Sequence, residues 1–282
     1  MPIRLAENNY GKSGVRLLRV SRQEGRHDLK ELTLAIRFEG DIEAAHVQGD
    51  NRKILPTDTM KNTVYSLARN SAADCIEDFA KQLVAFLLSG NPQVSAAEAV
   101  ISESPWDRLE IEGKPDPTTF VQSSRELRTT TVTQARGGAA KVVSGLENLV
   151  ILKTAGSAFT GYIKDALTTL PETRDRLFGT AVSAHWTYDS ENSAFAELRS
   201  KIRDLLLAAF AGHQSESVQH TLYAMAQNVL DHAAEIKDIQ LTMPNKHYLL
   251  VDLSRFGQDN PNEIFVPIDE PHGYIEARVT RE

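Results

Sequence analysis

Cysteine is nearly absent from this chain of 282 residues, since Cys75 is the only one. A single thiol excludes an internal disulfide and a zinc site built from several cysteines. Cys75 lies among apolar residues at helical spacing, so we predict that its side chain packs in the core. A reactive nucleophile is the less favoured alternative.

Positive charge and long apolar runs are also scarce. The formal net charge is −7, and an acidic balance argues against nucleic acid or an anionic membrane as a partner, since both attract clustered Lys and Arg. No apolar run reaches about 18 residues, the length that spans a bilayer. Neither end of the sequence resembles a secretory or peroxisomal signal. We therefore expect a cytoplasmic protein with no membrane partner.

Common catalytic motifs are missing as well. The sequence has no His-Glu-x-x-His, no P-loop, no Gly-x-Ser-x-Gly and no dinucleotide glycine fingerprint. Its 8 histidines are scattered, and none pairs with another three or four residues away on a carboxylate-bearing helix face. We therefore predict surface or packing roles for them and no bound metal.

The hydrophobic pattern of the first half predicts a hairpin followed by two helices. Apolar residues alternate over 32–38, which indicates a strand with one buried face, and residues 15–20 are its expected hairpin partner. Helical spacing follows over 60–68 and, more strongly, over 76–87. Ser71 and Asp74 have the spacing of a capping box for the second helix.

The second half shows the same order of elements. Its expected strands and helices are 127–135, 146–154, 182–188, 195–209, 218–229, 239–241 and 248–253. The polar segment 113–124 is the expected linker. We predict an α+β protein with two tandem domains, 1–136 and 137–282, each an antiparallel sheet with a helix pair on one face. The free sheet edges favour association into a larger closed assembly.

Two polar segments could bind an anion. Residues 55–63 look like a helix N-terminus, which Thr57 or Asp58 could cap; alternatively, its free N–H groups could bind a ligand. Further along, residues 169–172 have the pattern of a capping box with Arg176 about two turns later. A solvated Arg176 is the commoner outcome, whereas a ligand role needs its guanidinium to face a planar acceptor pair.

Two further segments carry polar side chains at element starts. Gln219 falls in the first turn of a helix, where most glutamines face solvent. Asn245 and His247 stand two residues apart on an expected strand and so share a face. This pair is either exposed at the strand start or buried with partners, and the pattern leaves both interpretations open.

Taken in order, these segments resemble the urate oxidase (uricase) family, which belongs to the tunnelling-fold group. The matching motifs are Tyr10-Gly11-Lys12, 57–63, 168–176, Ser217-Val218-Gln219 and 244–248, and residues 256–263 resemble the bacterial branch. Each motif alone is weak. Their common order from about residue 9 to residue 278 makes the resemblance specific.

The resemblance implies a substrate site. In the family, the residues matching Arg176 and Gln219 grip the edge of urate, and the one matching Phe159 stacks on the purine plane. The positions of Val218 and Asp58 supply backbone contacts, the latter through an N–H group at the helix start.

The resemblance also implies a set of groups that move protons and hold oxygen. Lys12, Thr57 and His247 match a proton-relay triad, in which Thr57 also contacts the substrate. Asn245 matches the residue that holds dioxygen or water above the ring. The implied reaction converts urate, O₂ and water to 5-hydroxyisourate and hydrogen peroxide without a cofactor.

The family usually forms homotetramers whose sheets close into a barrel around a tunnel. The resemblance implies active sites shared by neighbouring subunits, with Lys12, Thr57 and Asp58 from one and the other residues from its neighbour. The chain departs from the family pattern at Pro56, where we expect a small or branched residue; this proline restricts the loop before Thr57.

Two other functions remain open from the sequence. One is a different tunnelling-fold reaction on a purine or pterin, such as that of a cyclohydrolase or an aldolase. The metal-dependent members of that group use His and Cys ligands that this sequence lacks. The other is a purine-binding protein without catalysis, against which the complete set of Lys12, Thr57 and His247 argues.

Overall fold

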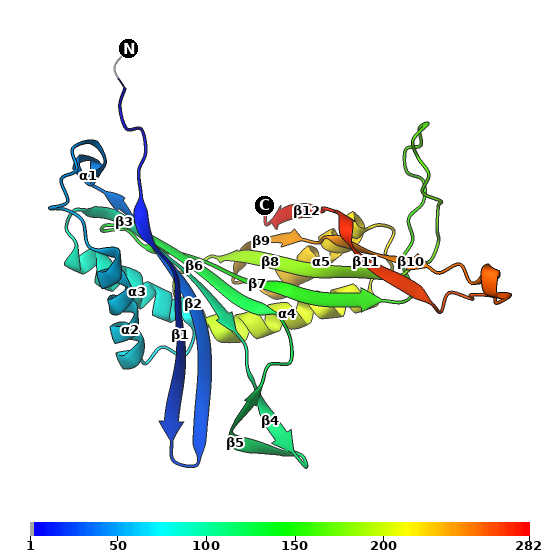
Figure 1. The fold of residues 1–282 in the computed structure, drawn as a ribbon, viewed down its shortest axis with the longest axis horizontal. Coiled ribbons are helices and arrows are strands. Elements are labelled where there is room, and N and C mark those ends of the chain that lie inside the picture. Colours follow the sequence, from blue (N-terminus) through cyan, green and yellow to red (C-terminus); the bar gives the residue numbers. More distant parts are fainter. Residues whose placement is uncertain (1–2) are drawn as a thin grey trace. The chain divides into compact units, whose positions relative to one another are not determined.

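The computed structural model describes residues 3–282, which form two compact units (Figure 1). The first unit comprises the chain up to Gly145 together with Thr187–Glu197, and the second comprises Leu146–Trp186 and Leu198–Glu282. Each unit combines an antiparallel sheet with helices. The predicted mixture of helices and antiparallel strands is therefore confirmed.

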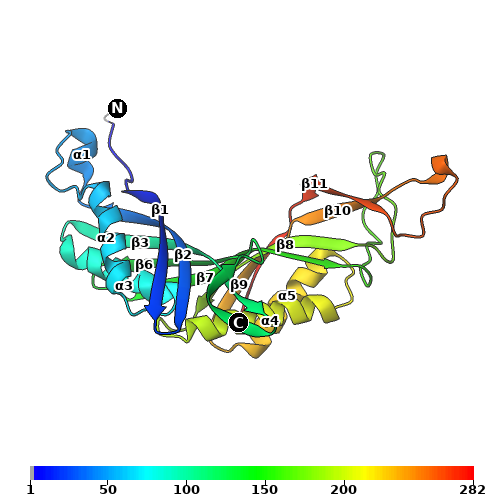
Figure 2. The same ribbon diagram turned by 60° about the horizontal axis from the view of Figure 1, so that its bottom comes forward.

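The sheet of the first unit follows the strand order β1-β2-β3-β6 and continues into β7. Its elements are β1 (Tyr10–Gln23), β2 (Arg26–Gly40), α1 (Glu43–Val47), α2 (Thr57–Asn70), α3 (Ile76–Gly90), β3 (Val94–Ser104), β6 (Leu127–Ala135) and the start of β7 (Ala140–Lys153). Strand β2 buries Leu32, Leu34, Ile36 and Phe38 in alternation, as the period of two predicts. Figures 1 and 2 show α2 and α3 on one face of these strands, and their apolar residues complete the core.

A β-bulge shapes the start of β1. Lys12 pairs with Ile36 and Val15 pairs with Leu34, so β1 holds one more residue than β2 across this stretch. Gly14 within the bulge has a φ of 68°, which favours glycine. A side chain on Gly11 would come within 1.8 Å of the Ile36 carbonyl oxygen, so the strands approach too closely for any other residue there. The bulge therefore fixes the backbone that carries Lys12.

The second unit repeats a sheet with two long helices. Its elements are the end of β7, β8 (Phe178–Tyr188), α4 (Phe195–Gly212), α5 (Val218–His232), β9 (Ile236–Thr242), β10 (Asn245–Leu250), η1 (Ser254–Phe256), β11 (Phe265–Gly273) and β12 (Glu276–Thr280). Strand β8 pairs with both β9 and β10. Strand β9 in turn pairs with β12, and β10 pairs with β11. Val182, Ala184 and Trp186 alternate into the core, as expected for β8.

Four local predictions were wrong. Residues 113–124 are no linker, because β5 (Lys114–Val121) pairs with β4 (Asp107–Ile111) inside the first unit. Ser71 ends α2, and α3 begins at Ile76 with no side-chain cap, so Ser71 and Asp74 form no capping box. Residues 169–172 start no helix, since 161–177 contains neither helix nor strand. Neither Thr57 nor Asp58 caps α2, whose N-cap residue is Pro56.

Cys75 stands at the N-cap position of α3 and is half-buried against the core of the first unit. Burial raises the pKa of its thiol to about 12, so the thiol stays protonated at neutral pH. The predicted packing role is thus supported. Within residues 3–282, no helix combines the length and apolar character needed to cross a bilayer.

Candidate active site

In the first unit, one hydrogen bond joins the two segments that carry the expected site residues. The Leu55 backbone N–H donates to the Tyr10 hydroxyl over 2.9 Å. Tyr10 begins β1 two residues before Lys12, and Leu55 lies two residues before Thr57. The Tyr10 ring packs edge-on against buried Phe38, with centroids 5.9 Å apart. This contact holds the entrance of α2 against the start of β1.

The N-terminus of α2 is open. Pro56 is the N-cap residue, and no side chain caps the helix. The Met60 N–H donates to the Pro56 carbonyl at 3.2 Å, which leaves the N–H groups of the residues before Met60 without helical acceptors. These groups carry the positive end of the helix dipole, where an anion is stabilised. The geometry fits the expectation that Asp58 offers a backbone donor.

The charges near this N-terminus belong to Asp58 and two lysines. Asp58 is exposed, forms an ion pair with Lys61 and accepts a hydrogen bond from Asn62 at 3.1 Å. The Lys61 contact is the main reason why the pKa of Asp58 is lowered, and the charge of Lys12 adds a smaller effect. Lys12 is half-buried on β1, which the hydrogen bond between Leu55 and Tyr10 holds against the entrance of α2, so Lys12, Thr57 and Asp58 lie on neighbouring segments of the first unit.

In the second unit, a hydrogen-bonded loop positions Phe159 and Arg176. Phe159 and Thr173 exchange backbone hydrogen bonds of 2.8 and 3.1 Å. The Asp175 carboxylate accepts from the N–H of Gly156 at 2.7 Å and, more weakly, from Ser157. The loop is therefore closed at its base by backbone hydrogen bonds and by the Asp175 carboxylate, and it lacks the helix that its sequence suggested. This closure places Phe159 and Arg176 together.

Phe159, Arg176, Asn245 and His247 line one cavity of about 480 Å³ in this unit. The Arg176 guanidinium lies over the Phe159 ring, 5.3 Å from its centroid. The structure thus gathers residues from the loop and from β10 that the sequence could relate only through the family resemblance. An aromatic face beside a guanidinium suits a planar, anionic ligand.

Arg176 is the most unusual residue of the cavity. Its side chain is about half-buried, and burial lowers the pKa of its guanidinium, which nevertheless stays charged at neutral pH. Its Nε atom is buried and has no hydrogen-bond partner among the described residues. A buried donor without an acceptor is costly, so this Nε is available to donate to a molecule in the cavity. Arg176 is thus partly buried against Phe159 rather than fully solvated.

Sequence reasoning missed Tyr162. Its ring stacks on Phe159 with centroids 4.7 Å apart and planes 15° from parallel. Tyr162 thus covers one face of Phe159, and the Arg176 guanidinium also lies over this ring, so a planar ligand must displace one of these two side chains to stack on Phe159. Two aromatic residues spaced by three in a polar loop were the available signal.

Val218 and Gln219 are the first two residues of α5, which confirms the helix-start prediction for Gln219. The Ser217 hydroxyl caps this helix by accepting from the His220 N–H at 3.1 Å. Ser215 exchanges backbone hydrogen bonds with Gly156 and Ala158, so the start of α5 is tied to the loop that carries Phe159. Neither Val218 nor Gln219 is among the residues that line the cavity.

Strand β10 presents Asn245 and His247 at its start, as predicted for a strand. Both residues are partly buried, so they are neither fully exposed nor fully buried, the two alternatives that the sequence left open. Asn245 pairs with Thr180 of β8, and Lys246 pairs with Gly179. The Tyr248 ring covers Gly179, where a Cβ atom would come within 2.6 Å of that ring. Gly179 therefore allows the close approach that positions the start of β10.

The histidines form no metal-binding cluster in the described part of the chain. Among residues 3–282, no group of three or more His, Cys, Asp or Glu side chains could hold a metal ion. His213 and His220 do contact each other through their ring nitrogens at 3.2 Å, a pairing that their spacing in sequence did not suggest.

Comparison with known proteins extends the resemblance over the whole chain. A sequence model of the uricase family matches residues 8–133 and 142–276. The uricase of Arthrobacter globiformis is 41% identical over 278 residues, which cover 99% of this chain and 90% of that protein. The uricase of Oryctolagus cuniculus is 35% identical over 286 residues, covering 99% of this chain and 95% of the relative.

The solved structures agree. The crystal structure of the uricase from Arthrobacter globiformis superposes with a TM-score of 0.94 at 40% identity, covering 100% of this chain and 96% of the other. The uricase from Bacillus fastidious, at 20% identity and a TM-score of 0.85, shares the fold. From these full-length similarities and the order of its site motifs, we conclude that the chain belongs to the uricase family.

Proposed function

We propose that this protein is a urate oxidase that converts urate, O₂ and water to 5-hydroxyisourate and hydrogen peroxide in purine degradation, with no cofactor. Full-length similarity to uricases supports the oxidation of urate. The observation that carries the substrate assignment is the unsatisfied Nε of Arg176 beside Phe159 in a cavity of the second unit. Urate is planar and anionic, which are the two properties that this pair selects.

Each unit contributes a different kind of contact to the proposed substrate site. Arg176 donates to one edge of urate, the Gln219 amide and the backbone at Val218 bind beside it, and Phe159 stacks on the ring. The open N-terminus of α2 contributes the N–H of Asp58, where the helix dipole stabilises negative charge on the substrate. Thr57, the first residue of α2, contacts the same ligand through its hydroxyl.

Proton movement is the role that we assign to Lys12, Thr57 and His247. The relay takes a proton from urate, and the resulting electron-rich anion gives electrons to O₂ held near Asn245. A peroxide forms at C5 of the ring, and water then replaces it, releasing hydrogen peroxide. Lys12 and Thr57 return the protons that hydrogen peroxide requires. The electron-rich substrate supplies the reducing power, so the protein needs no redox cofactor of its own.

We further propose that the active protein is a homotetramer of two tandem tunnelling-fold domains, 1–136 and 137–282, whose sheets close into a barrel. The site would then combine Lys12, Thr57 and Asp58 of one subunit with the cavity of its neighbour. The long strand β1, whose outer edge pairs with no other strand among residues 3–282, supports such closure. The cytoplasm is the proposed location.

The decisive experiment mixes purified protein with urate and a chelator and follows two signals, the ultraviolet absorbance of urate and dissolved oxygen. We expect equal molar loss of urate and oxygen, and added catalase should return about half of the oxygen, because the other product is peroxide. Urate that binds without loss of either signal would indicate a non-catalytic purine-binding protein. Turnover of a pterin but not of urate would indicate the other tunnelling-fold chemistry.

A further inference from the structure

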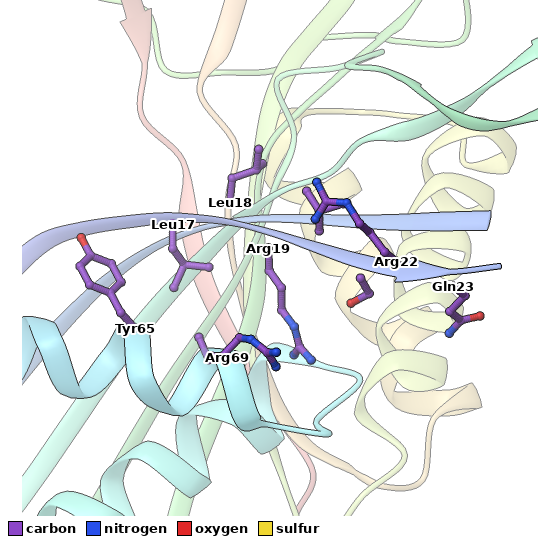
Figure 3. A pocket seen from close by; sticks show the side chains of 10 residues that line it. Leu17, Leu18, Arg19, Arg22, Gln23, Tyr65 and Arg69 are labelled. Atoms are coloured by element: carbon purple, nitrogen blue, oxygen red, sulfur yellow. The ribbon is translucent and has the colours of Figure 1, made fainter. Parts of the chain in front are cut away.

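Arginines line cavities in both units, and the two settings differ. In the first unit, Arg19, Arg22 and Arg69 line a cavity of about 760 Å³ beside β1 and α2 (Figure 3). This cavity follows the edge of β1 that pairs with no other strand among residues 3–282, where the proposed oligomer closes, so a neighbouring subunit would cover it. In the second unit, Arg176 lies instead in a loop that is held by contacts within the unit.

A short segment of the second unit, residues 156–159, lies between the parts of the chain that carry the expected substrate contacts. Phe159 belongs to this segment, and backbone hydrogen bonds of 2.8 and 3.1 Å join it to the loop that carries Arg176. The segment also contacts Ser215, which stands four residues before Gln219. It therefore connects the chain regions of all three expected binding side chains.

The contacts with Ser215 extend to the start of α5. The Ser215 N–H donates to the Gly156 carbonyl at 3.0 Å, and the Ala158 N–H donates to the Ser215 carbonyl at 2.7 Å. Ser215 is fully buried, and its hydroxyl donates to the Ser217 carbonyl at 3.1 Å. Ser217 in turn caps α5, whose second residue is Gln219. The position of Gln219 is thus linked to this segment through buried hydrogen bonds.

The Asp175 carboxylate holds the same segment from the side of Arg176. Its Oδ1 atom accepts from the Gly156 N–H at 2.7 Å and from the Ser157 N–H at 3.3 Å. The Thr173 hydroxyl donates to the backbone carbonyl of Asp175 at 2.7 Å, which fixes the turn that leads into Arg176. Hydrogen bonds from N–H groups to a carboxylate are stronger than those between neutral groups, so this contact is well suited to fix the loop.

We propose that Asp175 is a positioning residue, which sets the relative places of the three side chains expected to bind urate. It holds the 156–159 segment beside Arg176, and the backbone contacts of that segment place Phe159 and the start of α5. This inference rests on the proposed function, since urate is the ligand that these side chains bind. Without the acceptor, the three binding groups must be ordered when urate binds, which weakens binding and leaves the proton relay unchanged.

The experiment measures equilibrium binding of urate without oxygen and, in parallel, the kcat and KM of urate oxidation. Asp175→Ala should raise both the dissociation constant and KM about tenfold and change kcat by less than about twofold. Asp175→Asn keeps an acceptor oxygen at the same place, so it should retain most of the affinity. Asp175→Glu keeps the charge but moves the acceptor, so it should bind urate as weakly as Asp175→Ala.

Asp165→Ala is the matched control, because Asp165 is an exposed carboxylate of the same loop that lies outside the 156–159 segment. It accepts from the Leu167 N–H at 2.8 Å and from the Thr168 hydroxyl at 2.9 Å, and so shapes only its own turn. We expect its loss to leave urate affinity unchanged. When Asp175→Ala is combined with Arg176→Lys, the loss of affinity should be smaller than the product of the two single losses, because both changes act on the same guanidinium.

Equal urate affinity in the wild type and Asp175→Ala would overturn the proposal. The reverse order, with full affinity in Asp175→Glu and weak binding in Asp175→Asn, would overturn it as well, because the carboxylate would then act through its charge. Thermal unfolding of every variant gives a third contrary outcome, in which affinity falls with Tm in all variants, Asp165→Ala included. A protein that binds urate without oxidising it would reject the proposed activity, and the affinities alone would still decide the role of Asp175.

Discussion

In both units, an arginine that directly follows a strand donates hydrogen bonds to carbonyl groups at the end of the second helix. In the first unit, Arg136 follows β6 and donates to the carbonyls of Leu88, Asn91 and Val94 at the end of α3. In the second unit, Arg281 follows β12 and donates to the carbonyls of Leu230, Ala233 and Ile236 at the end of α5. The acceptors have the same spacing in both units, which supports the proposal of two tandem domains.

The units differ where the candidate site residues lie. The first helix of the first unit begins at an uncapped N-terminus beside Lys12, whereas the second unit holds a cavity with Arg176 and Phe159. Neither unit alone has both the expected relay and the expected substrate pocket. The two units share a scaffold, and the candidate site residues lie at a helix start in the first unit and in a loop in the second.

The largest expected effect is on kcat, when the proton-transfer group that the first unit contributes is removed. Lys12→Met should lower kcat by about 10²–10⁴-fold, because it removes a positioned proton-transfer group, and should change the KM for urate much less. Steady-state oxygen uptake measures both parameters. Lys61→Met, which removes a lysine four residues after Thr57, is the control and should keep nearly full activity. Unchanged kcat in Lys12→Met would contradict the relay.

Breaking the contribution of the second unit should instead weaken binding. Arg176→Lys keeps the charge but loses the planar fork, so we expect the KM for urate to rise about 10- to 100-fold. Anaerobic equilibrium binding of urate checks that the change lies in affinity. Arg174→Lys, two residues away and exposed, is the matched control. Equal affinity in wild type and Arg176→Lys would remove this residue from the site.

Because Arg136 and Arg281 make equivalent contacts, we expect the loss of either side chain to lower stability by a similar amount. Arg136→Met and Arg281→Met should each lower the free energy of unfolding by about 1–2 kcal/mol, since each removes charged donors from helix-end carbonyls. Denaturant unfolding of both variants measures this loss. A loss in only one of them would mean that the two contacts are not equivalent, which would weaken the case for tandem domains.

The smallest expected effect concerns Asp58, whose pKa is lowered chiefly by Lys61. A carboxyl with a lowered folded pKa stabilises the fold above its unfolded pKa of about 4, and this contribution disappears as the pH falls through the folded value. Lys61→Met should raise the pKa of Asp58 toward its ordinary value, and Lys12→Met should raise it less. Carboxyl titration by NMR measures both shifts, and the reverse order would mean that Lys12 lies nearer to Asp58.

Hydrophobic periodicity predicted much of the fold. The alternation in 32–38 and the helical stripe in 76–87 reflect burial of one face, and both elements appear in the structure. Capping patterns predicted less, because Ser, Thr and Asp also form turns. Ser71 serves as the end of α2 and binds Gln82, and residues 169–172 lie in a loop that is held by Asp175.

The site residues were predictable only in part from local pattern. Gln219 and the pair of Asn245 and His247 occupy the predicted element starts. That Asn245 and His247 line the same cavity as Phe159 and Arg176 depends on backbone hydrogen bonds between distant segments, which periodicity does not encode. The stacking of Tyr162 on Phe159 was not anticipated, for the same reason.

One measurement tests the central claim that residues of two subunits complete each site. Lys12→Met and Arg176→Ala proteins, each nearly inactive, are unfolded together in equal amounts and refolded. If the sites are shared, a mixed pair of subunits contains one site with both intact contributions, so we expect about a quarter of wild-type activity to return. No recovery, despite mixed oligomers shown by mass spectrometry, would mean that each chain supplies its whole site and would contradict the account.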